Sequence, residues 1–202
     1  MDRKVIFTTI ALALSLLLVV LGLFAINSDN SFGDRPSSIS ELGGDFTLQH
    51  HEGEVSLSDF TDKVVVMYFG FTSCPEVCPN SMGVISAAFN RMDQASQDQV
   101  QGLLVSLDPS RDSLANLAEY AEFYHHKIIG LTGSQDSITA VTNQYGAYYD
   151  FADISRAGED YAIEHSSRYY VIDQQGRLVA AMRHSTTPNE LKTQIEELLE
   201  TS

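Results

Sequence analysis

Residues 64–79 read VVVMYFGFTSCPEVCP, and this stretch decides the fold because it sets an uninterrupted apolar run directly against the only two cysteines. The run from Val64 to Phe69 is mostly β-branched and aromatic, which is typical of a central strand buried on both faces. Pro79 is followed by apolar residues at steps of three and four, so we expect an amphipathic helix that begins with this proline. Cys78 would then lie near the helix N-cap, with Cys74 in the preceding loop.

This placement predicts two reactive cysteines. Unpaired amides and the positive end of the helix dipole favour a thiolate over a thiol, although the carboxylate of Glu76 partly opposes this. The C-x-x-x-C spacing of Cys74 and Cys78 is one residue longer than the C-x-x-C of thioredoxin-type redox proteins. The two sulfurs can therefore bond to each other or diverge around a metal. A purely stabilising disulfide is disfavoured, because closing so short a loop removes little chain entropy.

Size and charge limit the possible functions. The 202 residues provide one ordinary domain with a full core beside any membrane segment, so no second domain is expected. The net charge of −15 argues against a nucleic-acid partner, since phosphates need basic patches, and it permits a cationic partner. The two cysteines do not by themselves define the redox compartment.

The N-terminus predicts a membrane anchor. Residues 5–26 carry no charge and as a helix would span roughly 33 Å at about 1.5 Å per residue, enough for a bilayer core. Arg3 and Lys4 place a short stub, residues 1–4, in the cytoplasm by the positive-inside rule. The alternative is a cleaved signal peptide, but residues 23–25, LFA, make a poor cleavage site. We expect residues 27–40 to be a flexible linker, because they are rich in Ser, Asn, Asp and Gly.

The expected order of elements in residues 41–202 resembles a thioredoxin-like α/β fold with an N-terminal β-hairpin extension, preceded by one transmembrane helix. The last helix has the clearest start, because Thr187 and Glu190 have the spacing of a capping box. The expected elements are a hairpin at 42–57, strands at 64–69, 99–107, 128–129, 148–151, 168–173 and 177–183, helices from 79, 113–124, 133–145 and from 187, and an acidic loop at 152–160.

The topology also nominates one of the six histidines. In a thioredoxin fold, the loop entering the terminal hairpin approaches the cysteine loop from across the sheet. Here that loop contains His165, which becomes a candidate metal ligand. By contrast, His50–His51 is expected to be a polar turn, and His125–His126 a surface pair favoured by a helix C-terminus.

Four motifs resemble the Sco/SenC family, and the resemblance covers nearly all of residues 41–199. Residues 68–79, YFGFTSCPEVCP, are similar to the family signature YFGFTxCPDxCP. Residues 106–112, SLDPSRD, and 130–133, GLTG, resemble its S-x-D-P-x-R-D and GLTG segments. Residues 160–165, DYAIEH, resemble its D-Y-x-V-D-H segment.

The resemblance implies one copper ion held by Cys74, Cys78 and His165, and a role in assembling the copper A centre of cytochrome c oxidase. Glu76 and Glu164 stand where the family commonly has Asp, which leaves the ligands unchanged. Two thiolates suit Cu(I), and an added imidazole suits Cu(II) as well, although zinc accepts the same donor types. Three ligands leave an open position, as a carrier needs. The three methionines Met67, Met82 and Met92 are expected to pack in the core.

The resemblance and the N-terminal segment together lead us to expect a copper chaperone anchored in a bacterial inner membrane, with its N-terminus cytoplasmic and its domain periplasmic. Its expected partners are the copper-site subunit of the oxidase and a periplasmic thiol reductant or copper donor. The alternative is a thiol-disulfide oxidoreductase that uses the redox pair Cys74 and Cys78 to reduce the partner's cysteines. A thiol peroxidase is less favoured, because no motif assigns a peroxidatic and a resolving cysteine.

Overall fold

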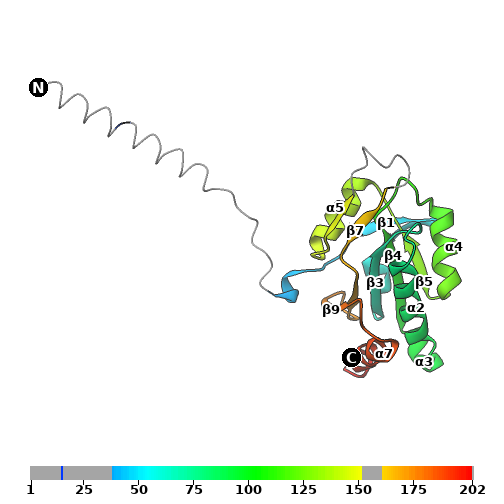
Figure 1. Ribbon diagram of the computed structural model, residues 1–202. Coiled ribbons are helices and arrows are strands. Elements are labelled where there is room, and N and C mark those ends of the chain that lie inside the picture. Colours follow the sequence, from blue (N-terminus) through cyan, green and yellow to red (C-terminus); the bar gives the residue numbers. More distant parts are fainter. Residues whose placement is uncertain (1–14, 16–37, 152–160, 202) are drawn as a thin grey trace, which may run out of the picture. The chain divides into compact units, whose positions relative to one another are not determined.

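The computed structural model describes Ser15 and residues 38–151 and 161–201 (Figure 1). Within these residues no helix is both long and apolar enough to cross a membrane. Apart from Ser15, the predicted span at 5–26 lies outside the described residues, and so do the acidic loop at 152–160 and most of the predicted linker.

A five-stranded mixed sheet with the strand order β5-β4-β3-β8-β9 forms the centre of the fold. Strands β3 (Val64–Gly70), β4 (Val100–Ser106) and β5 (Ile128–Leu131) are parallel, and β8 (Arg168–Ile172) and β9 (Leu178–Arg183) continue the sheet antiparallel. All residues of β3 and β4 are buried, as expected for apolar strands covered on both faces. This arrangement confirms the predicted thioredoxin-like α/β fold.

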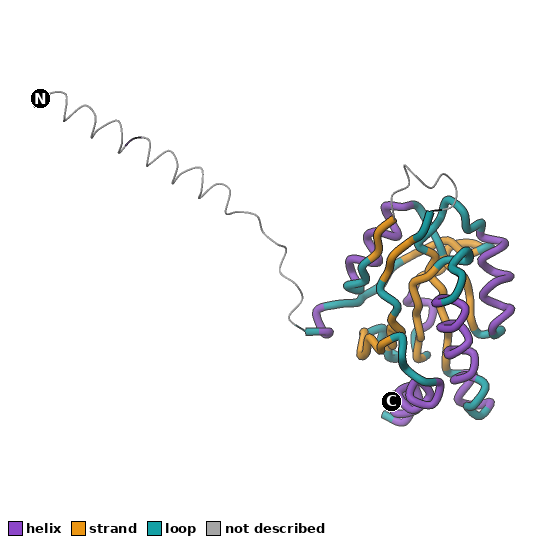
Figure 2. The backbone as a smooth tube through the Cα atoms, viewed as in Figure 1, coloured by secondary structure: helices purple, strands orange, loops and turns teal. Residues whose placement is uncertain are grey.

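Helices cover both faces of this sheet (Figure 2). Tyr68 and Gly70 point to the face that carries α2, because the Cys78 sulfur lies against Gly70. Phe69 points to the opposite face, where its ring meets that of Tyr145 at the end of α5. The helices are α2 (Val77–Phe89), α3 (Gln94–Asp98), α4 (Leu114–Tyr124), α5 (Gln135–Gln144) and α7 (Pro188–Glu200).

Two short antiparallel ribbons and two 3-10 turns complete the described chain. The predicted N-terminal hairpin is confirmed as β1 (Thr47–His50) paired with β2 (Gly53–Ser56). The second ribbon pairs β6 (Tyr149–Phe151) with β7 (Ile163–His165), so His165 ends a strand where the sequence predicted a loop. This three-residue strand is too short to show a periodicity, and its partner lies beyond residues 152–160. The 3-10 turns are η1 (Ile39–Glu41) and η2 (Leu57–Phe60).

The observed starts of α7 and α2 can be compared with the starts predicted from the sequence. The capping box of Thr187 and Glu190 is confirmed at the start of α7. The predicted start of α2 at Pro79 is wrong, because the helix begins two residues earlier, at Val77. Proline fits here all the same, since the N–H groups of a first turn have no intrahelical partner.

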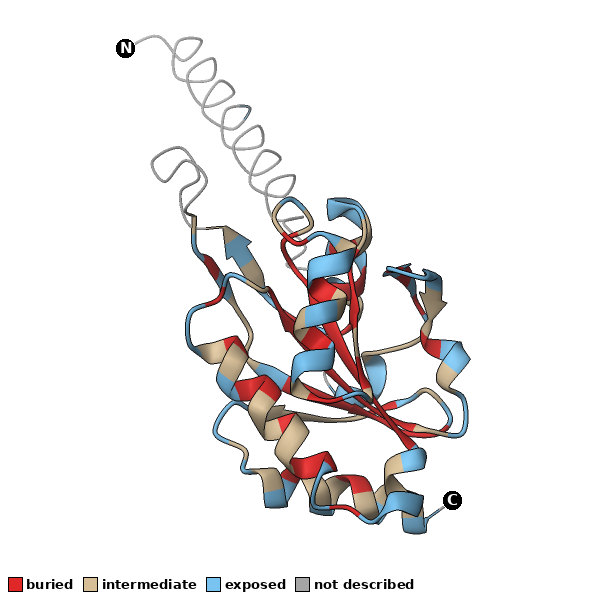
Figure 3. Cartoon of the chain, turned by 90° about the vertical axis from the view of Figure 1, so that its right-hand side faces the viewer, coloured by how far each residue is buried: buried red, intermediate tan, exposed pale blue. Residues whose placement is uncertain are grey.

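Buried residues are concentrated along the central strands (Figure 3). Met67, Met82 and Met92 are buried, which confirms their assignment to the core. The prediction of a surface position is wrong for His125, which is also buried. Its ring packs edge-on against Phe89 at 5.5 Å, because apolar contact outweighs exposure at this helix end.

Candidate metal centre

Three potential metal ligands converge at the carboxyl end of β3. The two sulfurs of Cys74 and Cys78 and one ring nitrogen of His165 all lie within 4.8 Å of one another. The Cys78 Sγ atom is 3.8 Å from His165 Nε2. Both cysteines are free thiols. The structure therefore brings together all three residues that the sequence nominated, from the β3–α2 loop, the first turn of α2 and the end of β7.

Gly70 allows α2 to approach the end of β3 closely. A Cβ atom at this position would lie 3.0 Å from Cys78 Sγ and 3.1 Å from Cε1 of Tyr68. Both distances are shorter than an ordinary contact, so only glycine leaves the sulfur its full space. The glycine that ends the apolar run therefore also makes room for the Cys78 sulfur.

His165 is placed by the β6–β7 ribbon. It pairs with Tyr149, and just beyond this pair the Ser166 amide donates to the Tyr148 carbonyl at 2.8 Å. The imidazole contacts two aromatic rings edge-on, with centroid distances of 6.1 Å to Tyr68 and 5.9 Å to Phe71. These rings limit its rotation, so its nitrogen stays directed at the sulfurs.

Asp112 anchors the loop that carries the cysteines. Its buried carboxylate accepts hydrogen bonds from the Thr72 amide at 3.0 Å, from the Thr72 hydroxyl, and from the Ser106 hydroxyl at 2.5 Å. The sequence placed this aspartate only near a helix start, and Ser113 makes the actual N-cap. This role was missed because Thr72 lies 40 residues away in the sequence. The segment SLDPSRD was the signal that could have identified it.

A second group of contacts, formed by Asp108, Arg111 and Tyr161, supports the position of Phe71. Arg111 forms an ion pair with Asp108, and the Tyr161 hydroxyl donates to the same carboxylate at 2.5 Å. The Arg111 guanidinium lies 3.8 Å from the centroid of the Tyr161 ring and 5.9 Å from that of Phe71. Such cation–aromatic contacts stabilise the position of Phe71, which in turn packs on His165.

Burial changes the protonation of two candidate ligands. Burial raises the pKa of the Cys78 thiol, and the neighbouring Cys74 adds to the increase, while the Phe71 amide and the Tyr68 hydroxyl oppose it. The prediction that the helix N-terminus makes this residue a thiolate is therefore wrong for the metal-free protein. Its side chain is fully buried, so the cost of desolvating a charge exceeds the effect of the helix dipole.

The pKa of the His165 imidazole is shifted in the direction that favours metal binding. Burial lowers the pKa of His165 below its ordinary value of 6.5, and nearby His184 lowers it further, against a contribution from the backbone at Ser166. The ring is therefore neutral at neutral pH, which is the form that coordinates metals.

The Cys74 sulfur already accepts a hydrogen bond from the Cys78 amide at 3.3 Å.

Replacing Asp112 by alanine should loosen the metal site. Three hydrogen bonds to a buried charged group would be lost, so we expect the free energy of unfolding to fall by about 2–3 kcal/mol. Copper affinity should fall by about 10–100-fold, as for other residues that support metal ligands. Chemical denaturation and a Cu(I) competition titration measure the two effects. The exposed Asp98, replaced by alanine, is the control and should leave copper affinity unchanged. An unchanged affinity in Asp112→Ala would contradict the anchoring role.

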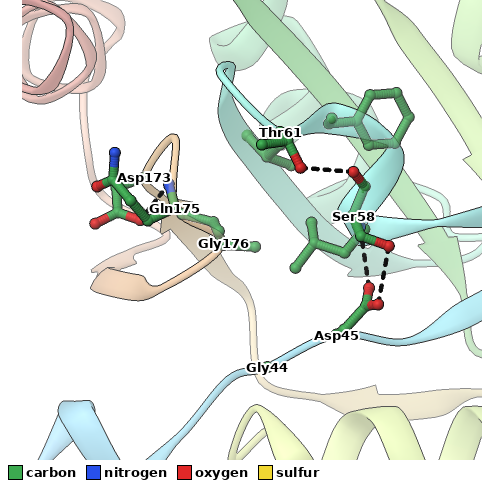
Figure 4. A pocket seen from close by; sticks show the side chains of 11 residues that line it. Gly44, Asp45, Ser58, Thr61, Asp173, Gln175 and Gly176 are labelled. Atoms are coloured by element: carbon green, nitrogen blue, oxygen red, sulfur yellow. Dashed lines mark hydrogen bonds between the residues drawn. The ribbon is translucent and has the colours of Figure 1, made fainter. Parts of the chain in front are cut away.

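The pocket shown in Figure 4 lies away from this centre. Its volume is about 250 Å³, and it contacts β3 at Val65, near the opposite end of the strand. Its polar groups already have partners, since Asp45 accepts from both the amide and the hydroxyl of Ser58, and Asp173 accepts from the Gln175 amide. The pocket therefore adds nothing to the metal centre.

The chain is similar to known proteins in both sequence and fold. The SCO1/SenC family model matches residues 34–200. The chain belongs to this family. Protein sco1 of Schizosaccharomyces pombe is 34% identical over 153 residues, which cover 75% of this chain and 58% of that protein. A SCO2-like protein of Rickettsia felis is 32% identical and covers 75% of this chain and 74% of its own length. This SCO1/SenC chain spans about half the length of the fungal and mammalian relatives it matches.

Solved SCO1/SenC structures share the fold of the described domain. Arabidopsis thaliana ScoI, described with copper bound, superimposes with a TM-score of 0.72 at 29% identity, over 80% of this chain and 99% of that one. Yeast Sco1, also described with copper bound, has a TM-score of 0.72 at 30% identity, over 80% of this chain and 90% of that one. These matches confirm the fold predicted from the sequence.

Proposed function

We propose that this SCO1/SenC protein binds one copper ion through Cys74, Cys78 and His165 and delivers it to the copper A site of a cytochrome c oxidase subunit. The observation that carries the proposal is the convergence of the three ligand atoms within 4.8 Å, with both cysteines reduced. The copper bound in the plant and yeast relatives supports the choice of metal.

The donor set fits both oxidation states of copper. Two thiolates are soft ligands that suit Cu(I), and the neutral imidazole adds a nitrogen that helps to hold Cu(II). Three protein ligands leave a coordination position open, through which an acceptor's ligand can attack and remove the ion. A carrier needs this property more than a permanent structural site does.

Thiol-disulfide exchange is the second candidate function. Two free thiols within 4.8 Å of each other need only a modest movement to form a disulfide. Burial disfavours the Cys78 thiolate, so we assign the attacking role to Cys74, the more exposed of the two. The position of His165 favours the carrier over this alternative, because dithiol exchange requires no third ligand.

The proposed location follows from the N-terminus. We propose that residues 5–26 anchor the chain, that residues 27–40 tether it, and that the domain at 41–202 lies on the exported side of a bacterial inner membrane. A reporter enzyme that is active only after export, fused after Ser202, should work, and the mature N-terminus should be intact. A new N-terminus near residue 25 would contradict the anchor and favour a cleaved signal peptide.

Copper loading should release a proton from Cys78 and should therefore strengthen with pH. Because the pKa of this thiol is raised, the metal-free protein holds the proton at neutral pH, and binding must displace it. Each displaced proton makes the affinity rise about tenfold per pH unit. Since the lowered pKa keeps His165 neutral, Cys78 should contribute this slope from about pH 6.5 to about pH 8. Cu(I) competition titrations across this range measure it, and a flat profile would contradict the assignment.

The deciding experiment for the proposed function combines binding with transfer. The full chain, reduced without oxygen in detergent, should take up close to one Cu(I) per molecule. It should then lose that copper to a metal-free copper A fragment of an oxidase subunit, as followed by the absorption of the copper A centre. Failure to bind stoichiometric copper would reject the proposal. Binding without transfer, together with reduction of an oxidised fragment, would support the oxidoreductase.

A further inference from the structure

Tyr68 carries a buried hydroxyl. The side chain is fully buried, and its oxygen makes no hydrogen bond to residues 38–151 or 161–201. An unpaired buried hydroxyl lowers stability, and phenylalanine would fill the same space without that cost. The folding of the metal-free domain therefore gives no reason for tyrosine at this position.

The metal centre adjoins this hydroxyl. A Cβ atom added at Gly70 would contact both the Tyr68 ring and the Cys78 sulfur. The ring and the sulfur therefore lie next to the same glycine. The Tyr68 ring also contacts the imidazole of His165 edge-on, with a centroid distance of 6.1 Å. The hydroxyls of Ser81 and Ser167 also lie near the Tyr68 oxygen, and Ser81 is hydrogen-bonded to His184 Nδ1 at 3.2 Å.

We propose that Tyr68 is a positioning residue of the metal centre, whose phenol donates a hydrogen bond to the Cys78 sulfur when this sulfur binds copper as a thiolate. The inference rests on the proposed copper site and assigns a residue that supports it. The Cys74 sulfur accepts from the Cys78 amide, and the Tyr68 phenol would give the Cys78 sulfur a side-chain donor.

The bond changes the electronic properties of the centre. A hydrogen bond to a metal-bound thiolate is charge-assisted, and it withdraws electron density from the sulfur. A less electron-rich sulfur stabilises Cu(II) less than Cu(I), and it shifts the sulfur-to-Cu(II) charge-transfer absorption to higher energy. Tyr68 would therefore favour Cu(I) in the loaded protein.

The test compares two variants that each remove one buried, unpaired hydroxyl. Tyr68→Phe removes the proposed donor. Tyr170→Phe is the matched control, since its hydroxyl is also buried and unpaired, but its ring packs against Phe69 on the opposite face of the sheet. Full-length wild type and both variants are loaded with Cu(I) and with Cu(II), and their affinities and absorption spectra are measured. Thermal unfolding of the metal-free proteins is recorded in parallel.

In Tyr68→Phe we expect the charge-transfer band at lower energy and the ratio of Cu(I) to Cu(II) affinity reduced about tenfold, the size typical of one hydrogen bond to a charged group. The metal-free variant should unfold no earlier than wild type, and Tyr170→Phe should leave spectrum and affinity ratio unchanged. Unchanged copper properties in Tyr68→Phe, with wild type binding copper, would overturn this inference alone. An equal shift in Tyr170→Phe, or a clearly lower unfolding temperature for metal-free Tyr68→Phe, would also overturn it. Absence of copper binding by wild type would overturn the proposed function as well.

Discussion

Replacing either Cys74 or Cys78 by serine should reduce Cu(I) affinity by more than about 100-fold. Residues that only support metal ligands already account for about 10–100-fold, and a thiolate ligand contributes more than they do. A serine hydroxyl is a hard donor that stays protonated at neutral pH, so it cannot replace a thiolate on Cu(I). Anaerobic titration against a competing Cu(I) chelator measures the loss.

The substitution Met82→Leu provides the control for this experiment. Met82 carries a soft sulfur and is buried in the same helix as Cys78, and replacement by leucine roughly preserves its volume. Met82→Leu should bind Cu(I) as wild type does. Tight stoichiometric binding by Cys74→Ser or Cys78→Ser would show that the copper is bound elsewhere.

Replacing His165 by alanine should separate copper delivery from thiol chemistry. Two thiolates alone hold Cu(II) poorly and can reduce it, so the variant should lose the stable thiolate-to-Cu(II) absorption and keep part of its Cu(I) affinity. The pair Cys74 and Cys78 should still form a disulfide and exchange with small thiols, because that reaction proceeds by thiolate attack without a metal. Absorption spectra and thiol exchange rates measure the two properties on one sample.

His184 supplies the matched control, since it is an exposed histidine close enough to affect the pKa of His165 but outside the group of ligand atoms. His184→Ala should retain the Cu(II) absorption. In cells, the carrier function predicts that oxidase assembly fails with His165→Ala although its thiol chemistry survives. Normal oxidase activity with His165→Ala, together with loss of activity with Cys74→Ser, would instead favour the thiol-disulfide oxidoreductase.

The sequence predicted most of the fold because its signals are local. The apolar run of β3, the cysteines directly after it and the capping box at Thr187 each depend on neighbouring residues, and all appear where they were expected. The order of strands and helices then led to the thioredoxin-like arrangement, which the sheet order confirms. The start of α2 was misplaced by two residues, because proline fits at more than one position of a first turn.

Sequence patterns thus predict the strand, the helix that follows it, the cysteine pair and, through topology, the candidate His165. The chemical behaviour of these groups depends on the tertiary structure. It buries Cys78 deeply enough to keep its thiol protonated despite the helix N-terminus, and it turns Asp112 from an expected helix-start residue into the anchor of the cysteine loop. The reason is distance along the chain. Burial and hydrogen bonding at the centre come from residues as far apart as Cys78 and His165, 87 positions from each other, and no local pattern encodes such contacts.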